Sequence, residues 1–75
     1  MQIDKEIDAR GLNCPLPLMK ARKAIAEMQS GQVLRVVATD SASMRDFLAY
    51  ARQAGHEMLG QQNVGREYIH VLRCR

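Results

Sequence analysis

The stretch IDARGLNCPLPLMKARKAI, from Ile7 to Ile25, decides how the first part of the chain folds. It places Pro15 and Pro17 directly where an apolar helical pattern begins. A proline in a helix interior costs about 3 kcal/mol, whereas one in the first turn costs little, because the amide hydrogens there have no partner within the helix. The two prolines therefore mark the start of a helix, and Cys14 lies directly before it.

Strand and helix patterns alternate along the rest of the chain. Apolar residues recur at helical spacing from Pro15 to Met28, and again, in the most regular pattern of the chain, from Met44 to a stop at Gly55. Runs of β-forming residues predict strands at residues 2–8, 33–38, 56–64 and 68–74. Smaller signals are the candidate N-caps Asp40, Ser41 and Ser43, the candidate bulge Gly60, and the hairpin residues Asn63 and Gly65.

The order of these elements, β-α-β-α-β-β, predicts the fold class. Strand-helix-strand units favour parallel crossovers, and the final hairpin adds an antiparallel pair, so a mixed four-stranded sheet is expected. Two helices can cover only one face of such a sheet. We therefore expect a two-layer α/β sandwich whose other sheet face is open to solvent or a partner. The 75 residues are expected to form one domain, 1–75.

The composition argues against several classes of protein. A content of 47% hydrophobic and 25% charged residues is ordinary for a globular domain. No apolar run approaches the roughly 20 residues of a membrane span, and MQIDKEID lacks the apolar core of a secretory signal, so a cytoplasmic protein is expected. Few aromatic residues and a net charge of +3 give little support to nucleic-acid binding. The spacing of the cysteines and histidines predicts no metal site, and we expect no cofactor.

Two interpretations of Cys14 are possible: it is either a small buried apolar residue or a reactive thiol. A residue before a proline is pushed out of the helical region, which places Cys14 outside the helix and at least partly in solvent. The positive end of the helix dipole favours a thiolate, and Arg10 could add to that effect. We therefore expect an accessible Cys14 thiol with a pKa below the ordinary value of about 8.5.

The neighbours of Cys14 narrow the chemistry further. Pro17 occupies the position where a Cys-x-x-Cys oxidoreductase has its second cysteine. A cysteine hydrolase needs a histidine base, and nothing in the sequence brings His56 or His70 to Cys14. A reactive thiol without a base or a resolving partner suits a carrier that accepts a group and passes it on. Cys74 is expected to have no role and no disulfide bond to Cys14.

At these residues the chain resembles the TusA/SirA-like small sulfur-carrier proteins, and the resemblance covers almost the whole sequence. The family pattern D-x-R-G-L-x-C-P-x-P is met by the run from Asp8 to Pro17. The resemblance continues through LMKARKAI, VVATD, an Arg-Asp pair on the second predicted helix, and AGHE. Cys-Pro-x-Pro in this context is specific, whereas alone it would be a weak signal.

The resemblance implies both fold and chemistry. It implies the β-α-β-α-β-β sandwich, and it implies that Cys14 is the catalytic residue and carries sulfane sulfur as a persulfide. The implied donor is a cysteine desulfurase or a rhodanese, and the implied acceptor is another sulfur-relay protein that serves tRNA thiolation or a related pathway. Such a protein acts as a sulfurtransferase without independent turnover. Matching positions place Arg22 and Asp40 near the partner-docking surface.

Other residues of the motif and of the first helix complete the expected site. Asp8 is expected to close the turn to Arg10 rather than to act as a base, and the residues expected to shape the site are Asp8, Arg10, Gly11, Pro15 and Pro17. Lys20, Arg22 and Lys23, with Arg10, form either a basic rim for docking an acidic partner or an ordinary solvated face. Two alternatives to the carrier stay open, a nucleic-acid-binding module and a regulatory interaction domain in which Cys14 is incidental.

Overall fold

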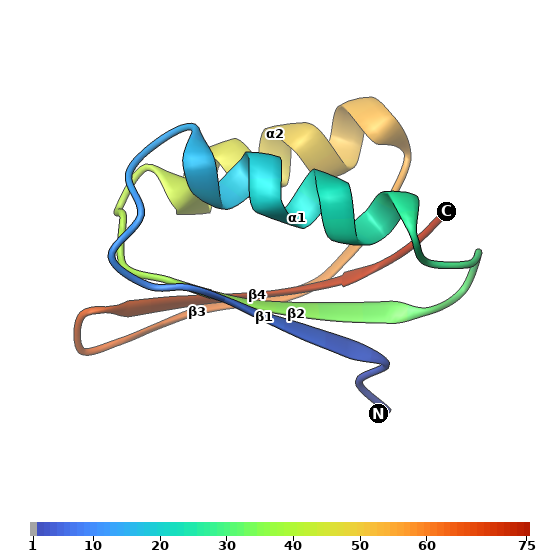
Figure 1. Cartoon of the computed structure of the whole chain (residues 1–75), viewed down its shortest axis with the longest axis horizontal. Helices are drawn as coiled ribbons and strands as arrows, with labels where there is room; N and C mark the ends of the chain where they lie inside the picture. Colours follow the sequence, from blue (N-terminus) through green and yellow to red (C-terminus); the bar gives the residue numbers. More distant parts are fainter. Residues whose placement is uncertain (1) are drawn as a thin grey trace.

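The computed structural model describes residues 2–75, and in this range it contains a four-stranded sheet and two helices (Figure 1). The elements follow the predicted order β-α-β-α-β-β. Their bounds are β1 Lys5–Ala9, α1 Leu16–Ala26, β2 Val33–Ala38, α2 Ser43–Ala54, β3 Glu57–Val64 and β4 Glu67–Arg73.

The strands lie in the order β1-β2-β4-β3, with β1 parallel to β2 and β4 antiparallel to both of its neighbours. The sheet is therefore mixed, as predicted. Both helices lie on the same face of the sheet, so the chain forms a two-layer α/β sandwich (Figure 1). Neither of the helices described between residues 2 and 75 is long and apolar enough to cross a membrane.

The core lies between the helices and the two central strands. β2, VLRVVA, has the bounds that were predicted for it, and its Leu34, Val36 and Ala38 are fully buried on the helix side. Small side chains on α1 let this helix approach the sheet closely, and the fully buried ring of Phe47 from α2 fills the remaining space. Burial of such side chains supplies most of the favourable free energy of folding.

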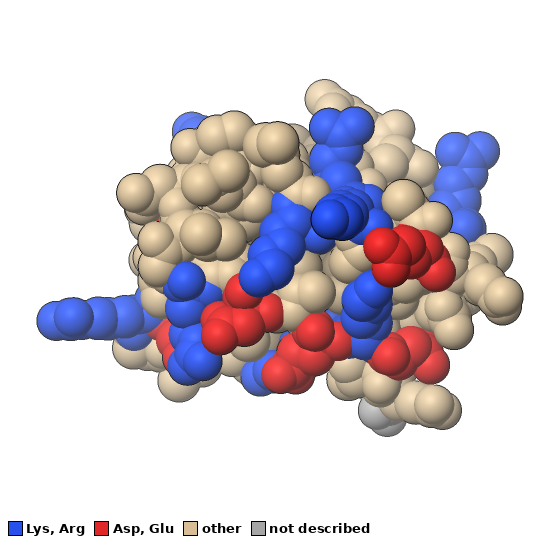
Figure 2. Space-filling view, in the orientation of Figure 1, with Lys and Arg blue, Asp and Glu red and all other residues tan. Residues whose placement is uncertain are grey.

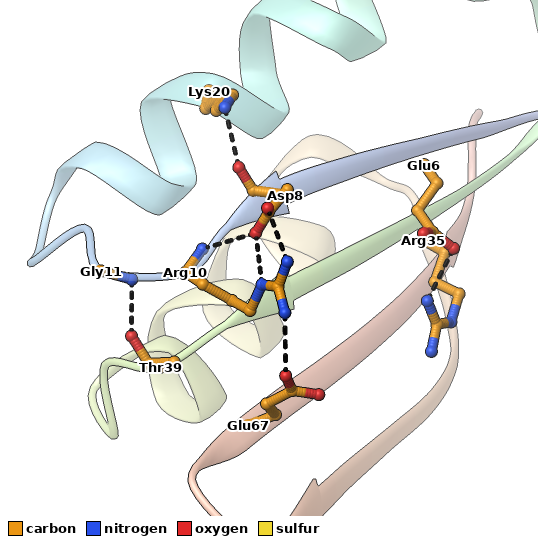
Figure 3. A network of polar contacts seen from close by, with 8 residues as sticks. All are labelled: Glu6, Asp8, Arg10, Gly11, Lys20, Arg35, Thr39 and Glu67. Carbon is orange, nitrogen blue, oxygen red and sulfur yellow. Dashed lines mark hydrogen bonds and ion pairs between the residues drawn. The ribbon is translucent and has the colours of Figure 1, made fainter.

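The opposite face of the sheet is open, as expected. Successive side chains of a strand point to opposite faces, so Glu6 and Arg35 point away from the core residues that neighbour them on β1 and β2. The two side chains form an ion pair of 2.6 Å across the open face (Figure 3).

The start of the first strand differs from the prediction, which placed it at residue 2. The strand begins at Lys5, and Ile3 before it is exposed. The reason is Asp4, whose carboxylate Oδ2 accepts the backbone N–H of Val33 at 2.8 Å. The side chain of Asp4 thus bonds to the Val33 N–H, which a longer β1 would have bonded through a backbone oxygen.

The start of α2 also corrects a prediction. The N-cap of α2 is Ala42, and no capping side-chain hydrogen bond is found there among residues 2–75. Asp40 instead uses its carboxylate Oδ1 to accept the N–H of Ala42 at 3.1 Å. The end of the helix agrees with the prediction, because Gly55 stops it with a φ of +80°, which glycine adopts without strain.

The last two strands form the predicted hairpin. Their register shifts between Met58 and Gly60, which confirms the irregularity expected at Gly60. The turn between them contains Gly65, with a positive φ of 61°. The hairpin places β4 in the interior of the sheet next to β2, and β3 at the edge.

Candidate functional site

Cys14 lies in the loop between β1 and α1, one residue before the helix N-cap Pro15, and its side chain is exposed. The predicted helix start and the predicted accessibility are therefore both confirmed. Pro15 is the N-cap and Pro17 lies in the first turn of α1, and at both positions a missing N–H leaves no partner unsatisfied.

Two side chains at the end of β2 hold this loop in place. The N–H of Gly11 donates to Thr39 Oγ1 at 2.8 Å (Figure 3), and the N–H of Cys14 donates to Asp40 Oδ2 at 2.6 Å. Gly11 has a φ of +80°, a conformation that other residues rarely adopt. The backbone of Cys14 is thus fixed while its thiol stays accessible.

Asp8 and Arg10 form the base of the loop (Figure 3). The Arg10 guanidinium donates to both carboxylate oxygens of Asp8, at 2.9 and 3.0 Å, and the Arg10 N–H donates to Asp8 Oδ1 at 3.0 Å. These hydrogen bonds lower the pKa of Asp8 to about 2, and the same pairing raises the pKa of Arg10. Arg10 also reaches Glu67 on β4 at 3.4 Å. Asp8 closes the turn, as predicted.

The thiol of Cys14 is surrounded by acidic groups and not by the expected cations. Its Sγ donates to Asp46 Oδ2 on α2 at 3.2 Å. That hydrogen bond, followed by desolvation and by the charges of Asp46 and Asp40, raises the thiol pKa, and Arg45 opposes the effect only in part. The prediction of a lowered pKa was therefore wrong. Arg10, which was expected to favour the thiolate, is instead engaged with the carboxylates of Asp8 and Glu67.

Asp46 is the residue in contact with the Cys14 thiol that the sequence did not predict. It lies 32 positions from Cys14 in the chain, on a helix that the crossover brings next to the start of α1. The two residues line a small pocket together with Pro15, Pro17, Leu18, Asp40, Ser43 and Phe47. The available signal was the Arg-Asp pair within the family pattern, at Arg45 and Asp46, whose role the sequence alone did not define.

The basic residues of α1 do not gather around Cys14. Lys20 Nζ donates to the backbone oxygen of Asp8 at 2.8 Å (Figure 3), so Lys20 supports the base of the loop. The guanidinium of Arg22 lies 5.9 Å from the centroid of the Tyr50 ring on α2. Lys23 is exposed and flanks a shallow hollow beside Arg22 and Met19.

An apolar surface lies on the first turns of α1, which follow Cys14 in the chain. Leu16 and Met19, in the first turns of α1, are 48% and 55% exposed. Figure 2 shows that the surface over the β1–α1 loop and the first turns of the helices, at the upper left, is largely uncharged, whereas Lys, Arg, Asp and Glu intermingle elsewhere on this face.

The histidines are structural. His70 is fully buried, its ring stacks on Phe47 with centroids 4.4 Å apart, and its Nε2 lies 2.9 Å from Ser43 Oγ. Burial lowers the pKa of His70 to about 4. His56 Nδ1 accepts the N–H of Arg75 at 3.0 Å. Within residues 2–75, no histidine is hydrogen-bonded to Cys14.

Cys74 is buried after the end of β4, and in residues 2–75 neither cysteine is in a disulfide bond. Its N–H donates to Gln32 O at 2.8 Å. Across the same residues, no group of three or more potential ligand side chains could hold a metal ion. The reactive candidate of the site is therefore the thiol of Cys14, with Asp46 as its direct contact.

Comparison with known proteins agrees with this geometry. Residues 5–74 match the family described as Sulfurtransferase TusA. The chain is 46% identical over 70 residues to the sulfur carrier protein TusA of Allochromatium vinosum, which covers 93% of this chain and 92% of that protein. It is 43% identical over 70 residues to the sulfur carrier protein TusA of Pseudomonas entomophila, covering 93% and 88%. A SirA-like protein from Desulfitobacterium hafniense has a similar crystal structure, with a TM-score of 0.82, 25% identity, and coverage of 92% and 95%.

Proposed function

This chain belongs to the TusA sulfurtransferase family of sulfur carriers, and we propose that it accepts sulfane sulfur as a persulfide on Cys14 and passes it to an acceptor protein. The observation that carries the proposal is the exposed thiol of Cys14 on a backbone fixed by Asp40 at 2.6 Å. A fixed, accessible sulfur can meet a partner's active site in one defined geometry.

The transfer needs no oxidant and no cofactor, because it is an exchange between sulfur atoms. The Cys14 sulfur, as thiolate, attacks the terminal sulfur of a persulfide on the donor. A new S–S bond forms on Cys14, the S–S bond of the donor breaks, and the donor cysteine leaves as a thiolate. The proton released from Cys14 goes to solvent and is recovered when the leaving thiolate is protonated.

We infer that the donor is a cysteine desulfurase or a rhodanese, and that the receiver is another sulfur-relay protein. Either partner must cover the β1–α1 loop to reach the thiol. The surface available there combines the exposed apolar side chains of Leu16 and Met19 with Arg22 and Lys23 further along α1. This combination suits an apolar partner surface with an acidic margin.

Two further features fit this function. Lys20 and Asp40 hold the loop from both sides, through Asp8 O and the Cys14 N–H, and so set the approach that a docking partner meets. A thiol that must stay free between donor and acceptor requires a reducing compartment, and we therefore place the protein in the cytoplasm.

Sulfur loading tests the proposal directly. After incubation with a cysteine desulfurase and free cysteine, intact mass spectrometry should report the gain of one sulfur atom per chain. Cys14→Ser should abolish the gain, and Cys74→Ser, which changes the buried cysteine, should not. Loading that persists in Cys14→Ser, or that fails with every desulfurase and rhodanese tried, would favour a regulatory interaction domain instead.

A further inference from the structure

The thiol of Cys14 is exposed and yet held by a carboxylate. Its Sγ lies 3.2 Å from Asp46 Oδ2, and the geometry makes the thiol the donor, because an ionised carboxylate can only accept. The hydrogen bond exists only while the sulfur is protonated. Asp46 therefore stabilises the form of Cys14 that cannot attack another sulfur.

Within residues 2–75, Asp46 forms only a weak ion pair. The contact from Arg45 Nε to its Oδ1 is long, at 3.6 Å, and the Arg45 side chain is 82% exposed. Asp40, the other carboxylate near the thiol, is already engaged by the N–H groups of Cys14 and Ala42. Among the residues that the structure describes, the charged groups that act on the thiol are thus Asp46 and Asp40, opposed by Arg45.

We propose that Asp46 is the selectivity-determining residue of the transfer step: it holds Cys14 as a protonated thiol in the free carrier and favours a donor that brings a cationic group beside it. The part that concerns the donor rests on the proposed function, whereas the part that concerns the free thiol does not. A cation paired with Asp46 weakens its hydrogen bond to Sγ. The thiol proton then leaves to solvent, and the thiolate attacks as described above.

The arrangement has a chemical advantage for a carrier. A thiolate exposed at a helix start reacts with any small electrophile or oxidant that it meets. A thiol kept protonated by Asp46 reacts slowly with such molecules. The free carrier is therefore protected from oxidants and small electrophiles. The cation of the donor pairs with Asp46 and so allows the thiol to ionise.

Alkylation of the free protein tests the first part. Against pH, the rate of iodoacetamide reaction at Cys14 should show an apparent thiol pKa about one unit lower in Asp46→Asn than in the parent chain, which corresponds to up to about tenfold faster alkylation at neutral pH. Asp46→Glu, which keeps the charge, should behave like the parent. Glu27→Gln removes a carboxylate at the far end of α1 and is the matched control. Peptide mapping assigns the adduct to Cys14, and circular dichroism checks that each variant is folded.

Charged thiol reagents test the preference for a cation. Methanethiosulfonate reagents with a trimethylammonium or a sulfonate group form the same mixed disulfide and differ in charge. The preference for a cation is the rate with the trimethylammonium reagent divided by the rate with the sulfonate reagent at Cys14, corrected by the same ratio for 2-mercaptoethanol. In the parent chain this preference should exceed one. It should fall in Asp46→Asn but not in Glu27→Gln. Equal preference in Asp46→Asn and the parent, or an unchanged thiol pKa in Asp46→Asn, would overturn the inference.

Sulfur loading separates this inference from the proposed function. Donor loading of Asp46→Asn should increase less than its alkylation does, because the donor already supplies the cation in the parent chain. An equal increase in both rates would refute the role of the donor's cation. A parent chain that no donor loads would instead refute the proposed function, and the results with the small reagents would keep their meaning.

Discussion

Cys14 depends on two neighbouring carboxylates with different tasks. Asp40 fixes its backbone through an N–H to Oδ2 distance of 2.6 Å, and Asp46 contacts its sulfur at 3.2 Å. The first carboxylate orients the residue, and the second affects the proton on the sulfur. Substitutions at the two positions should therefore have different consequences.

Asp40→Ala should destabilise the protein by about 1–3 kcal/mol, because it removes an acceptor from the N–H groups of both Cys14 and Ala42. Asp40→Asn keeps one acceptor oxygen and should therefore lower the free energy of unfolding by less than Asp40→Ala. Urea denaturation followed by circular dichroism gives the two free energies of unfolding. If Asp40→Ala were as stable as the parent chain, the hydrogen bonds would have no part in holding the loop.

At the scale of elements, α1 presents two different surfaces. Its first turns, which follow Cys14 in the chain, carry the exposed Leu16 and Met19, and its later turns carry Arg22 and Lys23. Arg22 stacks over Tyr50 of α2, so part of its role is to join the helices. Lys23 is exposed and is the cleaner residue for a test of docking.

Lys23→Glu should slow sulfur loading from a donor several-fold and leave the alkylation of Cys14 nearly unchanged. Lys23 lies roughly 13 Å from Cys14 along the helix axis at 1.5 Å per residue, beyond the Debye length of about 8 Å at physiological salt. Arg52→Glu, in the exposed last turn of α2, applies the same charge change at the end of the molecule opposite the β1–α1 loop and should load normally (Figure 1). Slower alkylation in Lys23→Glu, to the same degree as slower loading, would mean that Lys23 acts on the thiol and not on the partner.

The elements were largely predictable from the sequence, and the reasons are local. β2 was predicted with its correct bounds because its run of apolar β-formers is uninterrupted. The start of α1 was predicted to within a residue because two prolines mark it, whereas the helix ends at Ala26 and not at the predicted Met28. The start of β1 and the cap of α2 were not, because the side chains of Asp4 and Asp40 bond to segments distant in the chain. The contact of Asp46 with Cys14 was missed for the same reason.

At the scale of the whole molecule, the buried His70 joins the layers of the sandwich. Its ring on β4 stacks on Phe47 of α2, its Nε2 lies 2.9 Å from Ser43 Oγ, and its Nδ1 lies 3.1 Å from Gln61 Nε2 on β3. Burial favours the neutral ring and lowers the pKa of His70 from an ordinary 6.5 to about 4. The protonated ring therefore belongs mainly to the unfolded chain.

Stability should follow from this difference in pKa. The neutral ring of His70 contributes fully to the free energy of unfolding above about pH 6.5. As the pH falls from 6.5 to 4, that free energy should decrease by up to about 1.4 kcal/mol per pH unit. His56, whose pKa burial also lowers, acts in the same direction, whereas Asp8, with a pKa of about 2, loses its contribution only at lower pH. The free energy of unfolding can be measured by urea denaturation at several pH values between 7 and 5. Plotted against pH, it should change less steeply for His70→Gln than for the parent chain. Equal slopes in the two proteins would show that His70 is protonated in the folded state without cost.

The β1–α1 loop, which carries Cys14, lies at one end of the molecule, and the start of β1 and the end of β4 lie at the other (Figure 1). β1 begins at Lys5 and β4 ends at Arg73, whereas the loop with Cys14 follows the other end of β1. The domain can therefore be tethered to a surface or fused to another domain through either strand end without covering its sulfur. An immobilised or fused form of this protein should present Cys14 outward, toward whatever diffuses past it.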